Sequence, residues 1–219
     1  MVQIIPNITT NNVKEAQNQL FILQKIVKWI HIDVIDKRFS DTSTLTLEEL
    51  KGIKIPKKLV SIIHFSVGNP EKQIDLAYEI GAKIIISQIE AVIDQKEFVD
   101  KVLEKKMKIG LSLDAGTGME TIKAPLLPKL DMVLVMTIKT GWTGRSFIKA
   151  RLLEVKKLKK LKEKNDYKYK IAVDGGINED TIKDCVAAGA QVLFMHSAIW
   201  KHKDIKTAIN KLEALAKKV

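Results

Sequence analysis

Eight short apolar runs, rich in β-branched residues, recur at even intervals along the chain and constrain its fold more than any other feature. They cover residues 2–6, 29–34, 59–65, 83–88, 108–113, 132–137, 170–174 and 191–195. The longer segments between them carry apolar residues at helical spacing. Strands that alternate with helices favour a parallel sheet, and eight such units predict a (β/α)8 TIM barrel. A doubly wound open sheet is the alternative, which the even spacing disfavours.

The segments between the runs predict most of the outer helices. We expect helices within residues 11–28, 69–81, 94–106, 151–164, 178–189 and 203–219. Gly81 and Gly189 stand where glycine commonly ends a helix, each just before a predicted strand. The stretch 37–58 is irregular and holds at most a short helix. No linker or low-complexity segment divides the sequence, so we expect one barrel domain over residues 1–219.

Composition and charge limit the class of protein. Hydrophobic residues make up 46% of the chain and charged residues 29%, which is typical of a soluble globular protein. The apolar runs are too short to cross a bilayer, and the start does not look like a signal peptide, so we expect no membrane partner. The single cysteine, Cys185, excludes an internal disulfide and fits the reducing cytoplasm.

The net charge of +11 raises the question of a nucleic-acid partner. The lysines are spread over helical segments, and no basic run is interleaved with aromatic residues. This distribution favours a solvated basic surface over nucleic-acid binding, although such a surface can still attract small anions.

Catalytic residues of such barrels lie at the carboxyl ends of the strands. The residues that could act in catalysis or bind a metal are therefore expected at these ends of the predicted strands. His31 and Asp33 are two residues apart on the second strand, so their side chains point to the same side. His64 follows on the third strand and Asp174 ends the seventh. Two imidazoles and two carboxylates at one barrel mouth suit Zn²⁺, Fe²⁺ or Mn²⁺. A structural role for each histidine, and a turn-capping role for Asp174, stay open.

Three glycine-containing loops are predicted at the same mouth. They are TGWTGRSF at residues 140–147, GGIN at 175–178 and HSAIW at 196–200. Glycines let backbone amides approach an oxyanion closely, and loops after the last strands of barrels often bind phosphate. The first loop alone is better explained by a tight turn. Together the loops predict a phosphorylated small-molecule substrate.

These residues resemble the ribulose-phosphate 3-epimerase family over nearly the whole chain. The matching stretches are IIPNI at 4–8, HIDVIDKRF at 31–39, HFSVGNPEKQI at 64–74, VLVMTIKTGWTGRSFI at 133–148, VDGGIN at 173–178 and HSAIW at 196–200. They come in the order and with the spacing of the family. The resemblance implies a TIM barrel of the ribulose-phosphate-binding type and a carbohydrate isomerase of the pentose phosphate pathway. Homo-oligomers occur in the family, so a homo-oligomer is compatible with it.

The resemblance also implies roles for individual residues. One divalent ion (Zn, Fe, Mn or Co) would be held by His31, Asp33, His64 and Asp174. Asp33 would take the C3 proton of D-ribulose 5-phosphate and Asp174 would return one to the other face, giving D-xylulose 5-phosphate through an enediolate that the metal stabilises. Asp36 is expected in a turn or capping role. The expected substrate contacts are Asn7, His64, Met136, Gly141, Trp142, Thr143, Gly144, Gly175, Gly176, His196 and Ser197.

Several positions depart from the family pattern. Asn7 replaces a serine, Ile35 and Ser66 replace methionines, Lys139-Thr140 replaces Asn-Pro, and Thr143 and His196 replace glycines. All of the implied metal ligands and proton carriers are present, so these departures bear on the substrate more than on the chemistry. We expect His196, Lys139 and Arg145 to add positive charge around the substrate phosphate.

Three other functions are compatible with parts of the sequence. An epimerase of another ketose phosphate, such as a ketohexose 6-phosphate, is the nearest alternative, and a non-catalytic phosphosugar-binding protein is the second. Aldolase-like relatives on this scaffold usually carry Asp-x-Lys-x-x-Asp, and the sequence DVIDK at 33–37 disfavours them.

Overall fold

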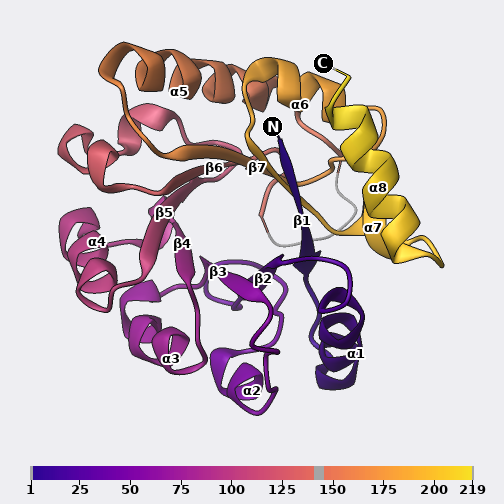
Figure 1. Cartoon of the computed structure of the whole chain (residues 1–219). Coiled ribbons are helices and arrows are strands. Elements are labelled where there is room, and N and C mark those ends of the chain that lie inside the picture. The colour runs from indigo at the N-terminus through magenta and orange to yellow at the C-terminus, as the bar shows by residue number, and fades with distance from the viewer. Residues whose placement is uncertain (1, 141–145, 219) are drawn as a thin grey trace.

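The computed structural model describes residues 2–140 and 146–218, and within these residues eight parallel strands close into a barrel (Figure 1). The strands are β1 (Gln3–Ile8), β2 (Trp29–Ile35), β3 (Val60–Ser66), β4 (Ile84–Gln88), β5 (Lys108–Leu113), β6 (Met132–Met136), β7 (Lys170–Asp174) and β8 (Val192–Met195). Each strand pairs with the next in sequence, and β8 pairs with β1. The predicted TIM barrel is confirmed, and the open sheet is excluded.

Helices surround the strands (Figure 1). They are α1 (Val13–Leu23), α2 (Leu47–Lys51), α3 (Ile74–Glu79), α4 (Gln95–Glu104), α5 (Leu152–Asn165), α6 (Ile182–Ala188), α7 (Ser197–Trp200) and α8 (Ile205–Ala216). The side chains of Asn12, Asp94 and Asp204 accept hydrogen bonds from first-turn amides and so begin α1, α4 and α8. Gly81 follows α3 and Gly189 ends α6, both with positive φ, as predicted. Among the described residues, every helix is too short or too polar to cross a membrane.

Short 3-10 segments complete several connections. They are η1 (Pro70–Gln73), η2 (Ile89–Ala91), η3 (Met119–Thr121), η4 (Ala124–Lys129) and η5 (Lys149–Arg151). The chain between β5 and β6 forms η3 and η4, where Pro128 lacks the amide proton that an α-helix would use. The predicted helix over 69–81 is divided into η1 and α3. The irregular stretch 37–58 holds only the short α2, as expected.

Two hydrophobic clusters lie on the two sides of the barrel wall. The larger joins the helices to the outer face of the strands and includes Ile30, Ile32 and Val34 of β2. The smaller fills the barrel interior and consists of Ile5, Ile62, Ile84, Ile86, Met132, Leu134, Met136, Ile138, Ala172, Val192 and Phe194. Because side chains alternate along a strand, the outward packing of Ile30, Ile32 and Val34 turns His31 and Asp33 inward.

Candidate metal and catalytic site

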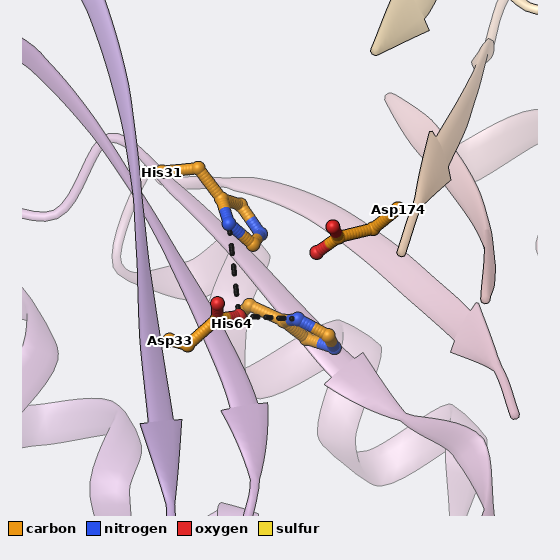
Figure 2. A group of neighbouring side chains, drawn as sticks. All are labelled: His31, Asp33, His64 and Asp174. Carbon is orange, nitrogen blue, oxygen red and sulfur yellow. Dashed lines mark hydrogen bonds and ion pairs between the residues drawn. The ribbon is translucent and has the colours of Figure 1, made fainter. Parts of the chain in front are cut away.

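The structure brings His31, Asp33, His64 and Asp174 together at the carboxyl-end mouth of the barrel (Figure 2). One potential ligand atom of each residue lies within 4.8 Å of those of the others, and we call these residues the ligand cluster. The strand register places them, because Asp33 of β2 lies opposite His64 of β3. Asp174 approaches from β7, on the other side of the group from Asp33 (Figure 2).

Asp33 accepts hydrogen bonds on both carboxylate oxygens. Its Oδ1 lies 3.1 Å from Nδ1 of His64 and 3.6 Å from Nδ1 of His31. Its Oδ2 accepts a 2.5 Å hydrogen bond from the hydroxyl of Thr9. Burial raises the pKa of Asp33, but His31 and the hydrogen bonds from His64 and Thr9 outweigh burial and lower the pKa to about 2. Asp33 is therefore an anion at neutral pH.

Asp174 has the opposite electrostatic balance. Nδ2 of Asn7 donates to both of its carboxylate oxygens, at 3.1 Å each. Burial and the negative charge of Asp33 raise the pKa of Asp174 well above its usual value, although the hydrogen bonds from Asn7 and Gly175 oppose the shift. Of the two carboxyl groups, Asp174 therefore keeps its proton to the higher pH.

His31 is the most deeply buried member of the ligand cluster. Its side chain is 0% exposed, and its ring stacks on Phe194 with 3.9 Å between centroids. Burial lowers the pKa of His31 to about 3 despite the opposing charge of Asp33, so the imidazole is neutral, which is the form that binds metals. Among the described residues, neither of its ring nitrogens has a hydrogen-bond partner.

These observations test whether a divalent ion suits the site. A buried nitrogen without a partner is costly, and coordination would give one nitrogen of His31 a partner. Two imidazoles and two carboxylates are also a donor set that Zn²⁺, Fe²⁺, Mn²⁺ and Co²⁺ accept. The ligand cluster therefore fits the ion that the sequence predicts.

A pocket adjoins the ligand cluster, and the space in it, including its open mouth, is about 600 Å³. The described residues that the sequence predicts as substrate contacts all line it, namely Asn7, His64, Met136, Gly175, Gly176, His196 and Ser197. The other predicted contacts, Gly141, Trp142, Thr143 and Gly144, lie outside the described residues, as does Arg145. The lining also includes Ile35, Ser66 and Thr140, which depart from the family pattern. Thr9 and Phe194 line it as well, and the sequence did not single them out.

Asn7 has a contact that sequence reasoning missed. The sequence predicts a substrate contact, whereas the structure directs its amide to Asp174. The indole of Trp200 donates a 2.8 Å hydrogen bond to the backbone carbonyl of Asn7 and so holds this part of β1. Asn7 therefore orients a carboxyl group of the ligand cluster.

Gly175 and Gly176 allow the loop after β7 to approach the end of β6. Both have positive φ, at 106° and 67°. A Cβ atom at Gly175 would lie 2.4 Å from Cγ1 of Ile138, so a larger residue does not fit. The hydroxyl of Thr137 donates to the carbonyls of Asp174 and Gly175 at 2.9 and 2.5 Å. This packing fixes the backbone that carries Asp174.

His196 and Lys139 differ in their relation to the pocket. His196 is half-buried and lines the pocket, and neither of its ring nitrogens has a partner among the described residues. Burial lowers the pKa of His196 despite the opposing charges of Asp33 and Glu15, which favours a hydrogen-bonding neutral ring over the expected positive charge. Lys139 is exposed, and it is not among the described residues that line the pocket.

Asp36 lies just beyond β2 and serves the backbone rather than the ligand cluster. Its carboxylate accepts hydrogen bonds from the amides of Arg38, Phe39 and Gly68 at 2.9 to 3.2 Å. This is the turn role that the sequence predicts for it.

The sequence of this chain is similar to those of known proteins. The sequence model of the ribulose-phosphate 3 epimerase family matches residues 3–200. The ribulose-phosphate 3-epimerase of Methanocaldococcus jannaschii is 32% identical over 190 residues, covering 87% of this chain and 80% of the relative. That of Treponema pallidum is 30% identical over 173 residues, covering 79% of each chain. That of Bacillus subtilis is 28% identical over 214 residues, covering 97% of this chain and 98% of the relative.

Solved structures resemble the fold at much lower identity. The 3-keto-L-gulonate-6-phosphate decarboxylase of Vibrio cholerae has a TM-score of 0.70 and 13% identity, covering 100% of this chain and 97% of its own. The 3-hexulose-6-phosphate synthase of Salmonella typhimurium has a TM-score of 0.66 and 16% identity, covering 99% of each chain. At such identities the likeness shows the fold alone. The family match, by contrast, spans the whole ligand cluster, and the chain belongs to the ribulose-phosphate 3-epimerase family of carbohydrate isomerases.

Proposed function

We propose that this protein is a metal-dependent epimerase that inverts C3 of D-ribulose 5-phosphate and so forms D-xylulose 5-phosphate. The observation that carries the proposal is the meeting of the ligand cluster at one barrel mouth, in a chain of this family. The substrate is inferred from the relatives, which are named ribulose-phosphate 3-epimerases.

The two carboxyl groups and two imidazoles of the ligand cluster have two functions, metal binding and proton transfer. His31, Asp33, His64 and Asp174 would hold a divalent ion, which would supply Lewis-acid stabilisation of the negative charge that develops when C3 loses its proton. Asp33 removes that proton from one face of the substrate, and Asp174 delivers a proton to the opposite face. Their positions on opposite sides of the cluster suit this inversion (Figure 2).

Hydrogen bonds hold the two carboxyl groups in these positions. Thr9 donates to Asp33, and Asn7 donates to both oxygens of Asp174. Misplacing a proton carrier by a fraction of an ångström slows proton transfer, because the donor and the acceptor must be within hydrogen-bond reach. These contacts therefore support a positioned acid–base pair.

The substrate phosphate would bind on the side of the pocket that the loops after β7 and β8 line. Gly175, Gly176, His196 and Ser197 are the described residues there. Both ring nitrogens of His196 are buried and are without partners in the described part of the chain. An N–H of this ring can donate to a phosphate oxygen.

One observation favours a second candidate, an epimerase of a longer ketose phosphate such as a ketohexose 6-phosphate. Ile35 and Ser66 line the pocket at positions where the family pattern has methionines. Serine is much smaller than methionine, so the pocket gains room beside His64. Ribulose 5-phosphate remains the first candidate because the named relatives act on ribulose phosphate.

The test is turnover of D-ribulose 5-phosphate by the purified protein supplied in turn with Zn²⁺, Fe²⁺, Mn²⁺ and Co²⁺. Asp33→Asn and Asp174→Asn should each lower kcat by about 10²–10⁴-fold or more. Asp36→Asn is the matched control and should have a much milder effect, because this carboxylate caps a turn. Deuterium from D₂O should enter C3 during turnover.

Two outcomes would contradict the proposal. One is the absence of turnover with all of the metals. The other is an Asp33 or Asp174 variant that is as active as the wild type. A higher kcat/KM for a ketohexose 6-phosphate than for ribulose 5-phosphate would select the second candidate.

A further inference from the structure

His64 contacts a buried glutamine on the side of its ring that faces away from Asp33. Nδ1 of His64 lies 3.1 Å from Asp33, and Nε2 lies 3.3 Å from Nε2 of Gln88. Gln88 ends β4, next to the strand of His64, and its side chain is 0% exposed. The glutamine is thus a neighbour of the ligand cluster without being part of it.

Gln88 continues into a chain of hydrogen bonds that reaches the loop after β6. Its Nε2 donates to the hydroxyl of Thr140 at 3.1 Å. That hydroxyl donates to Oδ1 of Asp114 at 2.6 Å, and the backbone amide of Thr140 donates to the same oxygen at 3.0 Å. The hydroxyl proton is therefore used by Asp114, and the oxygen of Thr140 is free to accept from the Gln88 amide.

This arrangement determines which nitrogen of His64 carries the proton. An amide nitrogen only donates, so Nε2 of His64 must accept from Gln88. A ring that carries one proton then has it on Nδ1, from which it is donated to Asp33. Nδ1 is also the nitrogen that faces the ligand cluster, as Figure 2 shows. In this form His64 presents a proton, and not a lone pair, to the metal site.

The buried carbonyl of Gln88 offers the other form. In the described part of the chain, Oε1 of Gln88 has no hydrogen-bond partner, which is costly for a buried amide oxygen. Turning the amide by half a rotation exchanges its oxygen and nitrogen. Oε1 would then accept a proton from Nε2 of His64 and leave a lone pair on Nδ1. Metal-binding histidines generally need such an acceptor behind the ring.

We propose that Gln88 is a positioning residue that sets the tautomer of His64, and that its amide turns over when His64 takes its metal-binding form. Thr140 and Asp114 hold the amide in the metal-free orientation. The proposal rests on the metal site of the proposed function. It concerns how the ring of His64 is prepared for the ion, and so how tightly the ion binds.

Nitrogen-15 NMR of the wild-type protein tests the tautomer directly. The ring signals of His64 are identified by their absence in His64→Gln. We expect the proton on Nδ1 in the metal-free protein and on Nε2 after addition of Zn²⁺. A proton on Nε2 already in the metal-free protein would overturn the proposal, and this measurement needs no folded Gln88 variant.

Calorimetric titration of the metal-free protein with Zn²⁺ tests the effect on binding. Gln88→Met keeps the size of the side chain but removes both polar groups, and it should weaken Zn²⁺ binding by about 10–100-fold. Gln88→Glu keeps an acceptor for Nε2 of His64 and should bind more tightly than Gln88→Met. The matched control is Gln19→Met, a buried glutamine of α1 that contacts Glu15, and its affinity should equal that of the wild type.

The outcomes separate this inference from the proposed function. Equal Zn²⁺ affinity of Gln88→Met and the wild type would overturn the positioning role and leave the metal site intact. A wild type that binds none of the four metals would remove the metal site, and the positioning role with it.

Discussion

Lowering the pH should destabilise the metal-free protein through His31. Burial holds the pKa of this ring at about 3 in the folded state, against 6.5 for an exposed histidine. Between these values the unfolded chain binds a proton that the folded chain does not, so the free energy of unfolding falls as the pH falls through this range. The stabilisation is complete above pH 6.5. From pH 7 to pH 5 the loss from this group is about 2 kcal/mol.

Urea denaturation in the presence of a chelator, followed by tryptophan fluorescence, measures this loss. Over that pH range the wild type should lose about 2 kcal/mol more than His31→Gln, whose side chain does not titrate. His202→Gln is the matched control, because His202 is exposed, and it should behave as the wild type does. Asp174, whose raised pKa acts in the opposite direction, is present in all three proteins.

Equal losses in the wild type and in His31→Gln would refute the reasoning. Such a result would mean that His31 binds its proton as readily in the folded protein as in the unfolded chain. Burial of the ring would then not be the dominant influence on its pKa.

Three further predictions follow from the site. Removal of divalent metal by a chelator should abolish epimerisation, and re-addition of one of the four metals should restore it; purified protein that contains no metal by elemental analysis and gains no activity from any of them would contradict this. Gly175→Ala should lower the free energy of unfolding by roughly 2–4 kcal/mol in urea titrations, because a positive φ and a 2.4 Å approach to Ile138 both disfavour a Cβ atom, and a loss below about 1 kcal/mol would contradict the steric argument. His196→Gly should raise KM for the phosphorylated ketose and leave metal affinity unchanged, whereas an unchanged or lower KM would show that His196 does not bind the phosphate.

The sequence alone determined the order of strands and helices, because apolar residues recur at helical spacing in the helices and form continuous runs in the buried strands. A strand buried on both sides reads as a continuous apolar run, and β5 and β7 lie where those runs predict. The predicted bounds of the helices are wrong where the local apolar pattern continues beyond the point at which the chain turns toward the next strand. The apolar pattern of 11–28 continues past Leu23, yet α1 ends there because the chain must turn back toward β2. The connection between β5 and β6 gave no helical period, and its prolines form 3-10 turns.

The sequence also placed the ligand cluster, since the carboxyl ends of parallel strands meet at one mouth whatever the loops do. Tertiary structure decided how those side chains are held. Asn7 contacts Asp174, Gln88 joins His64 to Thr140, and these partners lie 167, 24 and 52 positions apart along the chain. No local pattern records such pairs. They depend on the closure and stagger of the barrel, which bring β1 to β7 and the end of β4 to the loop after β6. The opposite pKa shifts of Asp33 and Asp174 have the same origin, because burial and neighbouring charges exist only once the barrel has closed.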